Sequence, residues 1–73
     1  MTMTYNKHVL YRWQTRGSRY WYEITACENG SFCVAGENSL SFCPTLDDAL
    51  QWAHECIAYA ARIDGIRFRK TIG

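Results

Sequence analysis

The sequence predicts one small α+β domain, in which an antiparallel sheet of five strands carries a single helix across one face. Three observations predict it: several stretches alternate apolar and polar residues, one stretch has helical spacing, and turn residues separate them. With 73 residues, 48% of them hydrophobic, the chain is long enough for one domain and too apolar for a disordered tail. We expect residues 1–73 to form a single domain, with residues 1–7 frayed.

The first two strands are expected at residues 8–14 and 20–27, because apolar and polar side chains alternate through both stretches. A two-residue turn at Arg16-Gly17 would join them and pair Val9 with Ile24. This hairpin would bring the apolar faces of both strands together, as a sheet with one buried face requires.

The third and fourth strands are expected at residues 32–35 and 40–43. A three-residue loop, Glu28-Asn29-Gly30, would keep the apolar residues of the third strand on the inner face, whereas a two-residue turn would reverse them. In the fourth strand, Leu40 and Phe42 are the large apolar residues, and we expect both on that inner face.

The helix is expected at residues 46–62. Thr45 is a suitable N-cap, Asp47 and Asp48 favour the positive end of the helix dipole, and Asp64-Gly65 supplies the stop. Apolar side chains recur along it at helical spacing and predict one buried face. They are Leu46, Ala49, Leu50, Ala53, Cys56, Ile57 and Ala60.

Residues 66–72 alternate again and predict a last strand, which gives the element order ββββαβ. If the first four strands form a meander, the helix returns the chain so that the last strand runs antiparallel to the first and pairs at its free edge. The expected sheet order is therefore 4-3-2-1-5.

Charge is segregated along the chain although the formal net charge is only +1. The first 20 residues carry four basic and no acidic side chains, residues 21–61 carry six acidic and no basic ones, and the basic excess returns after residue 61. With the expected sheet order, basic groups gather around the first and last strands, and acidic groups around the helix start and the far turns.

The sequence predicts a non-enzymatic protein with no metal site and no cofactor. The four cysteines, Cys27, Cys33, Cys43 and Cys56, lack the close pairs of zinc sites, and no phosphate loop or hydrolase motif is present. No run of ~18 apolar residues and no signal-peptide core is found, so we expect a cytoplasmic protein with reduced thiols and no membrane association.

Binding to a protein partner is the expected function, because exposed Trp, Tyr and Arg are the residue types enriched at interface hot spots. Most aromatic residues are expected in the core, but Trp21, stacked against Arg12, and the helix-rim residues Trp52 and Tyr59 are not. The expected partner-binding residues are Trp21, Arg12, Arg19, Trp52, Tyr59, Arg67, Arg69 and Lys70.

Two other partners stay open at this point. A basic sheet edge bearing aromatic residues also suits nucleic acid, whose bases stack on rings while arginine neutralises phosphates. An exposed edge strand and helix rim on so small a domain would also suit a homodimer.

One part of the chain resembles the hairpin-plus-helix of HicB-type antitoxins. The matching residues are Tyr22-Glu23-Ile24, Glu28-Asn29-Gly30-Ser31-Phe32-Cys33-Val34, Thr45-Leu46-Asp47-Asp48-Ala49-Leu50 and Ala53. The proline- and glycine-bearing segment of that family is replaced here by Leu40-Ser41-Phe42-Cys43-Pro44. In size the chain is also similar to small phage-encoded inhibitors of host machinery such as anti-CRISPR proteins. These resemblances imply a mobile-element setting.

Overall fold

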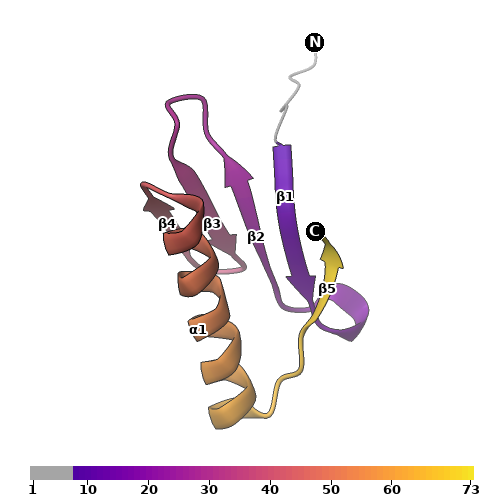
Figure 1. Cartoon of the computed structure of the whole chain (residues 1–73). Helices are drawn as coiled ribbons and strands as arrows, with labels where there is room; N and C mark the ends of the chain where they lie inside the picture. Colours follow the sequence, from indigo (N-terminus) through magenta and orange to yellow (C-terminus); the bar gives the residue numbers. More distant parts are fainter. Residues whose placement is uncertain (1–7) are drawn as a thin grey trace.

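Five strands and one helix follow one another in the predicted order (Figure 1). The computed structural model describes residues 8–73. The elements are β1 (His8–Gln14), a short 3-10 turn η1 (Arg16–Ser18), β2 (Trp21–Ala26), β3 (Phe32–Gly36), β4 (Leu40–Cys43), α1 (Leu46–Asp64) and β5 (Arg69–Ile72). Every strand pair is antiparallel, and the order across the sheet is β4-β3-β2-β1-β5. The predicted α+β class and sheet order are therefore confirmed.

Helix α1 covers one face of the sheet, and the opposite face carries no helix (Figure 1). Ala49 and Ala53 are fully buried, and their small side chains allow the helix to approach the sheet closely. They form one core cluster with Ile24, Val34 and Trp13. The core is therefore centred under the first half of the helix. Within residues 8–73, no helix is both long and apolar enough to cross a membrane.

The helix is closed at its start by the predicted N-cap, where the Asp48 N–H donates to Thr45 Oγ1 at 3.1 Å. Gly65 ends the helix in the left-handed conformation, with a φ of 68°, and its N–H donates to the Ala61 carbonyl. The helix thus runs to Asp64, two residues beyond the expected end.

Strand β5 begins at Arg69 rather than at residue 66. Ile66 still belongs to the helix cap, because its N–H donates to the Ala60 carbonyl at 3.2 Å. The residues between Ile66 and Arg69 cross from the helix end to the free edge of β1, so the paired strand is shorter than the alternating pattern suggests (Figure 1).

The predicted register between β1 and β2 is wrong by two residues. Instead of a two-residue turn, η1 and the residue after it join the strands, and the Thr15 N–H donates to the Tyr20 carbonyl at 3.0 Å. Arg12 therefore pairs with Glu23, and a bulge at Leu10 shifts Val9 opposite Thr25 rather than Ile24. A shift of two keeps each side chain beyond the bulge on its expected face, since the side-chain period of a strand is two.

The loop between β2 and β3 has the predicted three residues, 28–30. Cys27 N–H donates to the Ser31 carbonyl at 2.9 Å, and Gly30 adopts a positive φ of 92°. This geometry pairs Ile24 with Val34 and keeps both on the core face.

The prediction that Leu40 and Phe42 face the core is wrong. The Gly36 N–H donates to the Ser39 carbonyl, so a two-residue turn joins β3 to β4 and pairs Leu40 with Ala35. Paired residues share a face, and Ala35 lies on the face opposite Val34. Leu40 and Phe42 are consequently 61% and 66% exposed on the helix-free face of the sheet.

Candidate binding site

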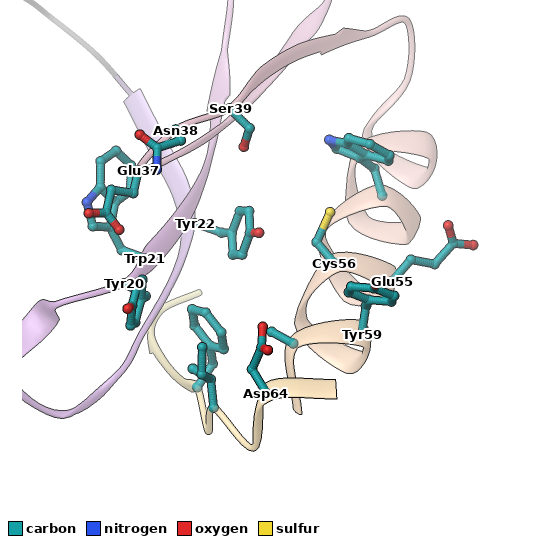
Figure 2. Close-up of a pocket in the computed structure, with 14 residues that line it drawn as sticks. Tyr20, Trp21, Tyr22, Glu37, Asn38, Ser39, Glu55, Cys56, Tyr59 and Asp64 are labelled. Carbon is teal, nitrogen blue, oxygen red and sulfur yellow. The ribbon is translucent and has the colours of Figure 1, made fainter. Parts of the chain in front are cut away.

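A pocket of about 480 Å³ lies between the second half of α1, β2 and the turn before β4 (Figure 2). Six of its lining residues are aromatic, three are acidic, and none is Lys or Arg. The lining consists of Tyr20, Trp21, Tyr22, Glu37, Asn38, Ser39, Trp52, Glu55, Cys56, Tyr59, Ala60, Asp64, Ile66 and Phe68. Its size is within the range of small-ligand sites.

The pocket opens beside the part of the helix stripe that follows Ala53. Ala49 and Ala53 are fully buried against the sheet, but Cys56 and Ala60, the next members of the stripe, are only half-buried and line the pocket. Small side chains here leave space that the core does not fill. The same stripe thus closes the core at one end of the helix and leaves the pocket at the other.

Tyr22 crosses the pocket toward the helix, and its hydroxyl points at Cys56 (Figure 2). Its ring packs against Phe68 at 5.5 Å between centroids. Gly36 makes room for this ring, since a Cβ at that position would lie 2.8 Å from Tyr22 Cε1. Tyr22 and Cys56 therefore join the sheet and the helix across the floor of the pocket.

The floor is uncharged at neutral pH. Burial raises the pKa of Tyr22 above its ordinary value, and the neighbouring Cys56 adds to this. Burial also raises the pKa of the Cys56 thiol, although the hydrogen bond from Tyr22 opposes the shift. Both groups hold their protons, and the charge of the pocket comes from its carboxylates.

We expect the folded protein to lose stability as the pH rises above about 9, the ordinary pKa of the thiol. Because both pKa values are raised by folding, the folded state keeps protons that the unfolded chain releases, so stability falls with pH in this range and is unaffected below it. Urea unfolding between pH 7 and 11 measures the slope. A Tyr22→Phe/Cys56→Ala variant should show a shallower decline, and an equal slope would contradict the assignment.

Three acidic residues line the pocket: Glu37 from the turn before β4, and Glu55 and Asp64 from α1. In Figure 2 the Asp64 carboxylate points toward the pocket interior, whereas the Glu55 side chain points to the outer side of the helix. Among residues 8–73, the one ion pair joins Arg12 to Glu23, so none of these three is neutralised by a described basic group. Glu55 accepts a hydrogen bond from Gln51 Nε2 at 3.2 Å. The pocket therefore presents a negative field over aromatic walls.

Trp52 and Tyr59 form the exposed helix side of the pocket, being 38% and 57% exposed. Trp52 and Glu55 also line a second hollow, of about 380 Å³, against β4. Trp52 therefore lies between two hollows of the surface, and each is open to a side chain of a partner.

The structure gathers the three predicted aromatic residues and leaves the predicted cations outside. Trp21, Trp52 and Tyr59 all line the pocket. Arg12 is held within the sheet by its ion pair with Glu23, and it lies 5.1 Å from the Trp21 ring, which confirms the expected stacking. Both partners of this arginine therefore lie within the chain itself.

The other predicted cations lie at the rim and at the far sheet edge. Arg19 lies 5.6 Å from the Tyr20 ring, and Lys70 lies 5.7 Å from the Tyr11 ring. Arg67 and Arg69 are both exposed; Arg69 begins β5, and Arg67 lies two residues before it. The predicted residues therefore fall on two surfaces, with the aromatic ones at the pocket and Lys70 and Arg69 at the basic edge of the sheet.

Several pocket residues were not predicted as functional. Tyr22 and Phe68 were expected only in the core, Asp64 only at the helix stop, and Glu37 and Glu55 were not expected to contribute to a site. A run of small residues on one side of the helix, Ala49, Ala53, Cys56 and Ala60, is the sequence signal that space could be left between helix and sheet. The sequence does not say at which end of the helix that space lies.

Cys56 is poorly suited to act as a nucleophile. A thiolate is the reactive form of cysteine, and the raised pKa of Cys56 disfavours it. His54 does not serve it as a base, because its ring packs against Trp13 at 5.5 Å. Within residues 8–73, no group of three or more His, Cys, Asp or Glu side chains is placed to hold a metal ion.

Comparison of the chain with protein-family models, curated proteins and solved structures finds no match.

Proposed function

We propose that the protein is a non-enzymatic binding protein that engages a protein partner at the pocket between α1 and β2. The observation that carries the proposal is that the three aromatic residues left outside the predicted core, Trp21, Trp52 and Tyr59, line one pocket. Aromatic side chains that are partly exposed beside a cavity are typical of interface hot spots. An inhibitory role in a mobile-element setting stays a prediction.

The charge distribution favours a protein over a nucleic acid as partner. Single-stranded nucleic acid needs rings and cations on the same surface, because bases stack while phosphates are neutralised. Here Trp52 and Tyr59 line the pocket together with three acidic residues and no Lys or Arg, whereas Arg69 lies in β5 at the edge of the sheet. Phosphates approaching the exposed rings would meet like charge.

The test is affinity capture from an extract of the source organism with the immobilised full chain. We expect a protein that the wild type retains and that Trp52→Ala and Tyr59→Ala each lose, with at least a tenfold drop in affinity, as for hot-spot residues. Ile63→Ala is the matched control, since Ile63 is as exposed as Tyr59 on the same helix and does not line the pocket.

The proposal fails if the pocket variants retain the same proteins as the wild type, or if the retained material is released by nuclease. Circular dichroism of each variant separates a lost contact from a lost fold. Equal losses in Ile63→Ala and Trp52→Ala would place the contact on the helix surface rather than at the pocket.

A further inference from the structure

The described chain leaves the pocket with an excess of negative charge over open aromatic ring faces. Glu37, Glu55 and Asp64 line it without a Lys or Arg, and the Tyr22 and Cys56 groups on its floor are neutral. All three carboxylate residues are exposed at the rim of the pocket. A cationic occupant would supply the opposite charge.

The rings of the pocket differ in whether a cation of the chain already lies against them. Arg12 lies over Trp21 and Arg19 over Tyr20, so these two rings have their cations within the chain. Trp52 and Tyr59 have no such contact among the described residues and are partly exposed. A cation over the face of such a ring is stabilised by the ring quadrupole.

We propose that the pocket receives an arginine side chain of the protein partner, its guanidinium stacked on Trp52 or Tyr59 and its charge balanced by the pocket carboxylates Glu37, Glu55 and Asp64 together. Guanidinium suits this lining better than ammonium for three reasons: it is planar and stacks on rings, it is weakly hydrated, and its fork of donors matches carboxylates. This inference rests on the proposed function, since it names what the partner inserts.

The test uses the full chain and short blocked peptides, Gly-Arg-Gly and its citrulline counterpart. Citrulline keeps the shape of arginine and lacks the charge, so only the cation is removed. Titration followed by amide chemical shifts should show saturable binding of the arginine peptide, with shifts at Tyr22, Trp52 and Cys56. The citrulline peptide should bind at least tenfold more weakly, as expected when charge-assisted contacts are lost.

Charge-neutralising variants test the carboxylates. Glu55→Gln and Glu37→Gln should each weaken arginine-peptide binding about two- to fivefold, the range for one partly exposed ion pair. Asp47→Asn is the matched control, because it removes the same charge from an exposed residue of α1 outside the pocket. Its affinity should equal that of the wild type.

Three outcomes would overturn the inference: no saturable binding of the arginine peptide at millimolar concentration, equal binding of arginine and citrulline, or tighter binding of a trimethyl-lysine peptide. Each is distinguishable from failure of the proposed function. If Trp52→Ala still loses the captured protein while arginine and citrulline bind alike, the pocket is a docking site for a neutral group. If Trp52→Ala changes neither result, both proposals fall.

Discussion

Replacing Ile24 by alanine is expected to lower the free energy of unfolding by about 2–5 kcal/mol, the range for deleting a buried aliphatic side chain and leaving a cavity. Ile24 is 0% exposed and lies in β2, the middle strand, between Tyr11 and Val34. A domain of this length has a total stability of about 4–11 kcal/mol. The substitution therefore removes a large part of what holds the fold together.

Urea unfolding and thermal unfolding followed by circular dichroism measure the loss, which should lower Tm by about 10 °C or more. Ile24→Val is the graded control and should cost about 0.5–1.5 kcal/mol. Phe42→Ala is the exposed counterpart and should change stability by no more than about 0.5 kcal/mol. If Ile24→Ala and Phe42→Ala cost the same, the assignment of the two sheet faces is wrong.

The second large effect is expected at Gly36, where alanine should cost about 1–3 kcal/mol by overpacking. An added Cβ would lie 2.8 Å from the Tyr22 ring and 2.9 Å from Ser39 Oγ, closer than such atoms approach. The backbone at Gly36 is not left-handed, so the cost is steric rather than conformational. Moving the ring also breaks the link from Tyr22 to Cys56.

A double-mutant cycle separates this cause from a general loss of stability. In a Tyr22→Ala background the ring is gone, and Gly36→Ala should cost much less than in the wild type. Additive costs would show that Tyr22 is not what Gly36 accommodates. The Gly36→Ala variant should also bind the arginine peptide more weakly, because the floor of the pocket has moved.

The fold is predictable from this sequence to the extent that local signals determine it. The cap at Thr45, the stop at Gly65 and the loop ending at Gly30 each depend on a few neighbouring residues, and all three have the expected geometry. The sheet order was predictable because a helix that returns the chain brings the last strand antiparallel to β1, whose edge is free.

The registers were harder to predict because turn geometry competes with side-chain pattern. The pattern alone assigns Leu40 and Phe42 to the core, but the short turn after Gly36 fixes the pairing and exposes both. Likewise, the bulge at Leu10 leaves no sign in the alternation of β1. In the turn after β3, the hydrogen bond from Gly36 to Ser39 outweighs the burial of two side chains.

The candidate site was predictable only in part. Trp52 and Tyr59 stand out in the sequence because they flank the helix stripe, and Trp21 because it alternates away from Tyr22. Their meeting in one pocket depends on how far the helix end stands from the sheet, which no local pattern encodes. The sequence therefore identifies the aromatic residues but not the cavity they share.

The sheet order places the basic residues Arg69 and Lys70 of β5 at one edge of the sheet, away from Glu37 in the turn between β3 and β4. Five strands set β4 and β5 about 19 Å apart, well over the screening length of about 8 Å in physiological salt. A diffusing partner therefore experiences one end at a time, whatever the net charge. A cationic partner would be attracted toward the acidic turn between β3 and β4 before contact. Added salt should therefore slow its association far more than it speeds its release.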